Sequence, residues 1–98
     1  MEILKPYRAQ IDALDKEIID LLRRRYDVIE EVAQIKLRED IAPVLQDRVD
    51  EVRENAASMA AEKNLAEEFI RQLYARIIEH SCNLEEKIIQ AAKAKKAS

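Results

Sequence analysis

Apolar residues recur in alternating steps of three and four along the first third of the chain, and this spacing predicts one long amphipathic helix. The helix is expected to begin at Pro6, because the missing proline N–H would have no partner in a first helical turn, and to end at Leu37 or Arg38. Arg25 takes a position where the series requires an apolar residue. The apolar stripe consists of Ile11, Leu14, Ile18, Leu21, Val28, Val32 and Ile35.

A second helix is expected beyond the break at Pro43, which cannot continue a helix and disfavours helical backbone in the residue before it. This helix should begin at Leu45 or Asp47 and end at Lys63. Asn64 is its best C-terminal cap, because Asn tolerates the left-handed conformation where no Gly is available. Its apolar face consists of Val49, Val52, Ala56 and Met59.

A third helix is expected from about Ala66 to Ala91, and the basic tail from about residue 92 is expected to fray. Its stripe repeats the anomaly of the first helix, because Ser81 falls among apolar residues and Glu85 follows one turn later. The stripe consists of Ile70, Leu73, Ile77, Ser81, Leu84 and Ile88. The pattern therefore predicts an all-α fold of three helices in a single domain over residues 1–98.

The length of the first helix predicts a homodimer. A helix of roughly 30 residues is about 45 Å long at 1.5 Å per residue, and two shorter helices cannot cover it. Its stripe continues over the whole length, so we expect a second copy to cover the remainder, with the two long helices paired. A monomeric three-helix bundle with a protruding helix is the alternative.

The composition agrees with a helical fold and excludes several classes of function. Strong helix formers dominate, since the 98 residues include no Gly and only two Pro. A net charge of −3 offers no basic surface to nucleic acid, and no apolar run reaches the roughly 20 residues that span a bilayer. Cys82 is the single cysteine, so it forms no internal disulfide, and the N-terminus lacks a signal-peptide pattern. We therefore expect a soluble cytoplasmic protein.

Cationic side chains on the inner sides of the helices indicate a pocket for a small polyanion. Arg25 and Lys36 are eleven residues apart, so they point to the same side of the first helix within about 20°. Unpaired charges are costly to bury, so each should face a solvent-filled pocket or an anion. Arg8 and Arg48 add cations at the starts of the first two helices. The sequence lacks a nucleophile beside a base, a metal cluster and a Gly-rich phosphate loop, so a reaction would depend on orientation and electrostatic stabilisation.

Each of these residues also has a structural interpretation. The alternative for the two cations of the first helix is that they extend to solvent or pair with carboxylates. The alternative for Ser81 is a hydrogen bond back to the carbonyl of Ile77, and for Glu85 an ion pair with a surface Lys or Arg. The lone His80 is expected to have a structural role at or near the surface.

Three stretches resemble the all-helical class of chorismate mutases, small intertwined homodimers that convert chorismate to prephenate. They are YRAQIDALDKEIIDLLRRRYDVIEEVAQIK, PVLQDRV and IIEHSCNLEEKI. Arg8, the I-D-x-L-D run that ends at Asp15, Arg25 and Lys36 recur at the spacing of the family, and the likeness covers the chain to about Gln90. The resemblance implies a chorismate mutase, an isomerase of aromatic amino-acid biosynthesis that rearranges the dicarboxylate chorismate to prephenate without a cofactor or metal.

The resemblance also implies roles for the cations. Arg8, contributed by the partner chain, and Arg25 match the two arginines that bind the carboxylates of chorismate. Lys36 matches the lysine that donates to the ether oxygen, where negative charge builds as the C–O bond lengthens. Arg48 matches an arginine that supports the pocket from the start of the second helix.

The remaining site positions agree with the family only in part. Ser81 and Glu85 match its polar pair on the third helix, as a substrate-binding and a catalytic residue, but many members have Gln for Glu85, and only a protonated carboxyl could donate there. The usual mutases have Glu directly after Arg48 and Asp three residues before it, where this chain has Val49 and Leu45. An arginine followed by Val occurs in isochorismate pyruvate lyases and aminodeoxychorismate mutases. These two activities therefore stay open, as does a non-catalytic helical dimer.

Overall fold

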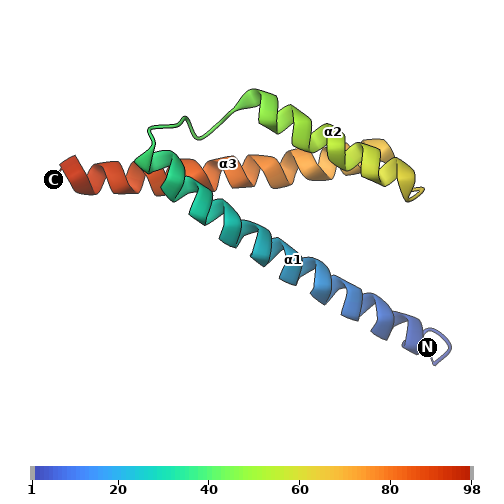
Figure 1. The fold of residues 1–98 in the computed structure, drawn as a ribbon. Coiled ribbons are helices and arrows are strands. Elements are labelled where there is room, and N and C mark those ends of the chain that lie inside the picture. The colour runs from blue at the N-terminus through green and yellow to red at the C-terminus, as the bar shows by residue number, and fades with distance from the viewer. Residues whose placement is uncertain (1, 98) are drawn as a thin grey trace.

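The computed structural model describes residues 2–97 of the chain and folds them into three α-helices (Figure 1). Helix α1 spans Lys5–Arg38, α2 spans Gln46–Glu62 and α3 spans Glu67–Ala97. No strand occurs within the described range. The predicted all-helical class and the long first helix are confirmed.

The ends of α1 and α2 follow from local sequence. Pro6 lies in the first turn of α1, as its missing N–H predicts. Both helices end in a residue with left-handed backbone, Asp40 after α1 with a φ of 55° and Asn64 after α2 with a φ of 58°. In each case the N–H of the next residue donates back to the helix at 2.8 Å, which satisfies a terminal carbonyl. The predicted cap at Asn64 is confirmed, and Asp40 has the same role without having been predicted.

Helix α3 continues through residues 92–97, where the sequence analysis expects a frayed tail. The segment AAKAKKA consists of Ala and Lys, which are strong helix formers, and it contains no Gly or Pro to end the helix. The expected end at Ala91 is therefore wrong. Within residues 2–97 no helix is long and apolar enough to cross a bilayer.

Helix α3 is the element on which the other two assemble. Within the described chain, α1 and α2 each pack against α3 and not against each other, and Figure 1 shows α2 running beside α3 while α1 diverges from it. Three small residues of α2, Ala56, Ala57 and Ala60, are buried and allow a close approach to α3. Met59, which the sequence analysis places on this face, is 56% exposed, and Ala60 is buried instead.

The apolar residues of α1 lie along one broad side, and only the second half of that side is covered within the protomer. The covered part includes Tyr26, Ile29 and the fully buried Ala33. The predicted stripe continues along this side, since Ile18 precedes Ile29 by eleven residues, but its first four residues and Val28 are more than half exposed. They are Ile11, Leu14, Ile18, Leu21 and Val28.

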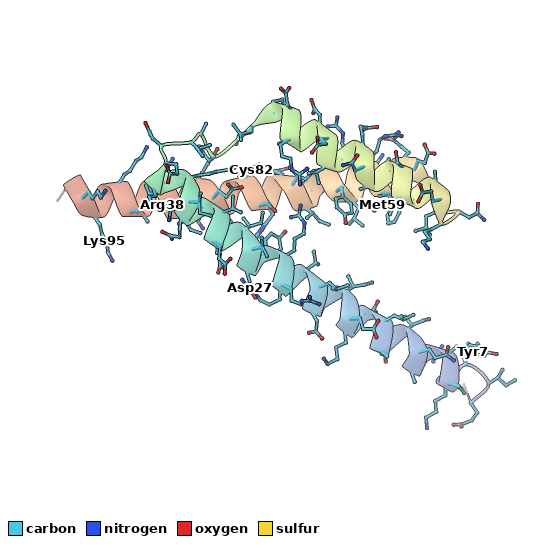
Figure 2. All side chains as sticks on the ribbon, in the orientation of Figure 1. Tyr7, Asp27, Arg38, Met59, Cys82 and Lys95 are labelled. Carbon is cyan, nitrogen blue, oxygen red and sulfur yellow. The ribbon has the colours of Figure 1, made fainter. Side chains whose placement is uncertain are left out.

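The protomer is extended because the first half of α1 projects beyond the other helices. Its radius of gyration is 17.6 Å, whereas a compact domain of this length has about 13 Å. All of residues 2–20 are exposed. Figure 2 shows the side chain of Tyr7 at the free end of α1, far from Cys82 on α3.

Candidate active site

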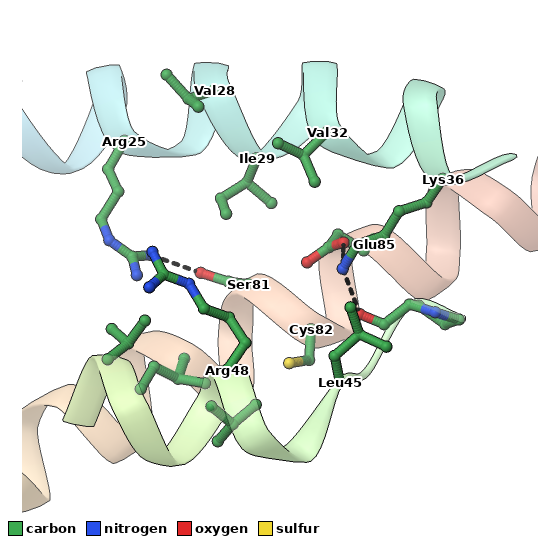
Figure 3. A pocket seen from close by; sticks show the side chains of 14 residues that line it. Arg25, Val28, Ile29, Val32, Lys36, Leu45, Arg48, Ser81, Cys82 and Glu85 are labelled. Carbon is green, nitrogen blue, oxygen red and sulfur yellow. Dashed lines mark hydrogen bonds and ion pairs between the residues drawn. The ribbon is translucent and has the colours of Figure 1, made fainter. Parts of the chain in front are cut away.

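A pocket of about 400 Å³ lies between α1, α2 and the middle of α3 (Figure 3). This volume is typical of sites for small molecules. Most of its wall is apolar, with Val and Ile side chains from all three helices. The charged and hydroxyl-bearing residues that line it are Arg25, Lys36, Arg48, Ser81 and Glu85. The structure thus brings together five of the six residues singled out from the sequence.

Arg25 reaches across from α1 to α3 and meets a buried hydroxyl. Its Nη1 donates to Oγ of Ser81 at 2.8 Å, and that Oγ donates to the carbonyl oxygen of Ile77 at 2.9 Å. The hydrogen bond from Ser81 to Ile77, expected as the structural alternative, is confirmed. Among the ion pairs of residues 2–97 none involves Arg25, so its positive charge is not neutralised by a carboxylate.

Lys36 is held at the other end of the pocket by one hydrogen bond and one ion pair. Its Nζ lies 2.7 Å from Oε1 of Glu85 and donates to the carbonyl oxygen of Pro43 at 2.9 Å. The Lys36 and Glu85 side chains are only 14% and 6% exposed, so the partner of Glu85 is a pocket lysine and not the expected surface cation. Oε1 is buried and accepts no hydrogen bond from the described residues, so the attraction of opposite charges holds the pair.

Arg48 enters the pocket from the first turn of α2. Its side chain is mostly exposed and forms an ion pair with Glu51. In Figure 3 the guanidinium groups of Arg48 and Arg25 point toward each other across the pocket. Two like charges directed at one volume repel each other, and an anion between them would relieve that repulsion.

The side of the pocket near the start of α2 is formed by Leu45, Val49 and the thiol of Cys82. Burial raises the pKa of the Cys82 thiol, and the negative charge of Glu85 raises it further. A thiol with a raised pKa stays protonated at neutral pH and is a poor nucleophile. This wall therefore offers apolar contact and no reactive group.

His80 lies outside this pocket, at the junction of α1 and α3. It is exposed, and its ring meets the ring of Tyr26 edge to face with the centroids 5.1 Å apart. The contact is of the kind that aromatic pairs favour in packing. It agrees with the structural role expected for His80.

Arg8 is the one candidate residue that the structure does not bring to the pocket. It is exposed and lies on α1 seventeen residues before Arg25, which is about 25 Å along a helix axis. An arginine side chain cannot cover that distance, so Arg8 does not serve the pocket of its own chain.

One polar group of the site was not found from the sequence, the carbonyl of Pro43 that accepts from Lys36. A backbone acceptor depends on the path of the loop between α1 and α2, and no residue type marks it. The spacing of Lys36 and Pro43 limits the loop length but does not determine where the carbonyl points.

Comparisons with known proteins find relatives that match most of this chain in sequence. The 4-amino-4-deoxychorismate mutase of Streptomyces venezuelae is 36% identical over 86 residues, which cover 88% of this chain and 84% of that protein. The protein of the same name from Streptomyces pristinaespiralis is 32% identical over 91 residues, covering 93% of this chain and 70% of the relative.

A more distant relative has a second activity in its name. The bifunctional chorismate mutase/prephenate dehydratase of Buchnera aphidicola is 29% identical over 84 residues, which are 86% of this chain but only 22% of that longer protein. No solved structure gives a significant match. Residues 7–86, most of the chain, match the family described as chorismate mutase type II. This chain therefore belongs to the type II chorismate mutase family and is an isomerase.

Proposed function

We propose that this chain catalyses the Claisen rearrangement of a chorismate-type dicarboxylate, with 4-amino-4-deoxychorismate as its substrate. The observation that carries the proposal is the charge of the pocket. Three cations, Arg25, Lys36 and Arg48, line it together with one carboxylate, Glu85, which leaves two positive charges in excess among the lining residues, one of them on Arg48, which also pairs with Glu51 outside the pocket. A substrate with two carboxylates has the complementary charge.

The positions of the cations suit the two ends of such a substrate. Arg25 and Arg48 point toward each other and can bind a carboxylate, for which the guanidinium fork has the matching geometry. Lys36 lies further along α1 and has three N–H donors. Among the described residues the carbonyl oxygen of Pro43 accepts one of them, and Glu85 is an ion-pair partner at 2.7 Å without a hydrogen bond, so a further N–H is available to the ether oxygen of the substrate.

The reaction requires no group that the pocket lacks. In the rearrangement the C–O bond between the ring and the enolpyruvyl oxygen breaks, a C–C bond forms between the enolpyruvyl methylene and the ring, and no atom leaves. No proton transfer or covalent intermediate is needed, which suits a site whose only thiol stays protonated. The protein has to hold the enolpyruvyl arm over the ring and stabilise the charge that develops on the ether oxygen.

The names of the relatives favour the 4-amino substituent on the ring of the substrate. The side chains of Leu45 and Val49 can neither accept nor donate a hydrogen bond, so at these positions neither a ring hydroxyl nor a ring amino group would have a partner. Both Streptomyces relatives are named for the 4-amino compound. Chorismate is the second candidate, because the family match and the Buchnera relative favour it.

A direct assay tests the substrate. Purified protein is mixed separately with 4-amino-4-deoxychorismate, chorismate and isochorismate, and loss of the cyclohexadiene absorbance is followed. Mass spectrometry then separates isomerisation, which leaves the mass unchanged, from release of pyruvate. The highest kcat/KM is expected for 4-amino-4-deoxychorismate with unchanged mass. Preference for chorismate would select the second candidate, pyruvate from isochorismate would indicate a lyase, and no turnover would indicate a non-catalytic helical dimer.

We also propose a homodimer in which the two α1 helices pair and Arg8 of each protomer reaches the partner's pocket. The uncovered first half of the α1 stripe supports it, because Ile11, Leu14 and Ile18 are each more than half exposed on an isolated protomer. The distance of Arg8 from its own pocket supports it as well. Analytical ultracentrifugation should show a dimer that Ile18→Lys dissociates, and a stable wild-type monomer at micromolar concentration would contradict the proposal.

The proposal includes a reducing compartment such as the cytoplasm, because Cys82 is a free thiol in the wall of the pocket. Alkylation of the protein in freshly lysed cells, followed by mass spectrometry, should find Cys82 reduced. A mixed disulfide at Cys82 in most of the protein would contradict this location.

A further inference from the structure

We propose that the loop between α1 and α2, residues 39–45, positions Lys36 for catalysis through the backbone carbonyl of Pro43. The carbonyl fixes the direction of the Lys36 ammonium, whereas Glu85 balances its charge. This inference rests on the proposed function, in which Lys36 donates to the ether oxygen of the substrate. Pro43 is a positioning residue, because its carbonyl acts on Lys36 and not on the substrate.

The two partners of Lys36 differ in kind. Its Nζ donates to the carbonyl oxygen of Pro43 at 2.9 Å, and it lies 2.7 Å from Oε1 of Glu85 without a hydrogen bond to it (Figure 3). The attraction of an ion pair depends on distance, whereas a hydrogen bond weakens steeply once donor and acceptor are misaligned. Within residues 2–97 the Pro43 carbonyl is the one hydrogen-bond acceptor of this ammonium, so it determines where the remaining N–H donors point.

The loop is itself bonded to the backbone of Lys36. Asp40 has left-handed backbone with a φ of 55°, and beyond it the N–H of Ile41 donates to the carbonyl oxygen of Lys36 at 2.8 Å. The loop is thus joined to Lys36 twice, through the backbone at Ile41 and through the side chain at Pro43. These two bonds hold the acceptor at a fixed place relative to the side chain that it orients.

The chain around the acceptor has little conformational freedom. The ring of Pro43 fixes its φ at about −65°, and a proline restricts the residue before it, here Ala42, to extended backbone. Pro43 is half-buried, and it lines a cavity of about 250 Å³ together with Ile89 of α3, which is 6% exposed. A donor held by such an acceptor is oriented before the substrate binds, so no reorganisation is needed when charge develops on the ether oxygen.

An amide-to-ester replacement tests the carbonyl without changing a side chain. Val44 is replaced by its α-hydroxy analogue, so that the carbonyl of Pro43 belongs to an ester, which is a weaker hydrogen-bond acceptor than an amide. The replacement also removes the N–H of Val44, which donates to no acceptor in the described part of the chain. We expect kcat to fall roughly three- to tenfold with KM nearly unchanged, because the oriented donor acts on charge that develops in the transition state.

A matched control makes the same chemical change in the same loop. Replacing Ala42 by its α-hydroxy analogue weakens the carbonyl of Ile41, which accepts no hydrogen bond from residues 2–97, and Ala42 does not line the active-site pocket. This ester should leave kcat and KM nearly unchanged. Equal losses of kcat in both esters would show a general weakening of the loop, and a rise in KM alone in the Val44 ester would show an effect on substrate binding. Either result would overturn the positioning role.

A kinetic cycle identifies the residue through which the carbonyl acts. The background is Lys36→Ala/Glu85→Gln, which lacks the ammonium and leaves no unpaired carboxylate at position 85. If the carbonyl acts through Lys36, the Val44 ester should lower the residual kcat of this background by less than about 1.5-fold. A loss as large as in the wild-type background would show that the carbonyl acts independently of Lys36, which would contradict the proposal.

A spectroscopic measurement separates this inference from the proposed function. In free protein with nitrogen-labelled lysine and carbonyl-labelled proline, a scalar coupling across the hydrogen bond should join Nζ of Lys36 to the carbonyl carbon of Pro43. The Val44 ester should reduce this coupling. Absence of the coupling in a wild-type protein that turns over its substrate would overturn the positioning role alone. No turnover of any substrate would overturn the proposed function and the catalytic role of the loop with it, and the coupling would then identify the hydrogen bond as purely structural.

Discussion

Replacing Lys36 by Ala should destabilise the protein as well as slow the reaction. The Lys36 ammonium lies 2.7 Å from the carboxylate of Glu85, whose side chain is 6% exposed. At this separation the attraction is about 6 kcal/mol with an effective dielectric constant of about 20, and desolvation offsets part of it. Removing one partner of such a buried pair costs about 3–5 kcal/mol, because the other charge stays buried without compensation. Small proteins have a total stability of about 5–15 kcal/mol, so the loss should be large.

A second substitution separates the two effects. In Lys36→Ala/Glu85→Gln the uncompensated carboxylate is gone, so most of the lost stability should return. Turnover should not return, because a donor to a developing oxyanion contributes about 2.7–4 kcal/mol, or about 10²–10³ in kcat. Glu85→Gln alone should keep Lys36 in the pocket and remain active, since a neutral amide does not repel the developing charge.

Urea denaturation followed by circular dichroism measures the stabilities, and the absorbance assay measures kcat on the same preparations. Protein concentration has to be held constant across variants, because dimer formation would make the midpoint depend on it. A loss of less than about 1 kcal/mol in Lys36→Ala would show that the Lys36–Glu85 ion pair contributes little to stability, contrary to the cost expected for breaking a buried pair. Recovery of turnover together with stability in the double variant would show that Lys36 has only a structural role.

Three other changes test separate parts of the structure. Arg25→Leu should abolish substrate binding yet raise the thermal midpoint, because an apolar side chain suits a half-buried position, and a lower midpoint would show that Arg25 stabilises the fold. Asp40→Gly should stabilise by about 0.5–1 kcal/mol in urea denaturation, since Gly adopts a φ of 55° without steric cost, and destabilisation would mean that the Asp side chain caps α1. Hydrogen bonds from Arg53 and then Arg71 lower the pKa of Glu54, so its contribution to stability is present above the ordinary Glu value and is lost as the pH falls through the lowered one. The thermal midpoint of Glu54→Gln should therefore lie below that of the wild type at neutral pH and converge with it in acid, and a constant difference would exclude this linkage.

The sequence predicts the helices well because local features determine them. Pro43 and the absence of Gly leave few places where a helix can end, and the observed bounds of α1 and α2 differ from the predicted ones by a residue or so. The convergence of Arg25 and Lys36 was predictable for the same reason, since the helical repeat alone places residues eleven apart on one side. The distance from Arg25 to α3 could not be predicted, because it depends on the angle at which α1 crosses α3.

The hydrophobic pattern of the sequence does not determine which surface an apolar side of a helix packs against. The stripe through Ile11 and Ile18 has the spacing of a buried face, yet in the protomer it is exposed, whereas Ala33, further along the same helix, is buried. Hydrophobic periodicity identifies an apolar side of a helix, but it does not show whether that side packs against the same chain or against a second copy. The burial of Ala60 in place of Met59 has a similar origin, because a close approach of two helices selects for small residues that periodicity does not distinguish.

The polar residues of α3 explain why the first helix can carry cations in a half-buried face. Ser81 and Glu85 are the buried polar residues of the described chain, and each binds one cation of α1. Apolar residues at positions 25, 36, 81 and 85 would pack at least as well, since buried ion pairs rarely stabilise a protein more than well-packed hydrocarbon. The polar residues at these four positions around one pocket therefore do not maximise the stability of the core. The two anchors also differ in charge, because the neutral Ser81 leaves Arg25 fully cationic while Glu85 balances Lys36. The pocket thus holds one cation ready for a carboxylate and a second cation that is already paired with a carboxylate of its own chain.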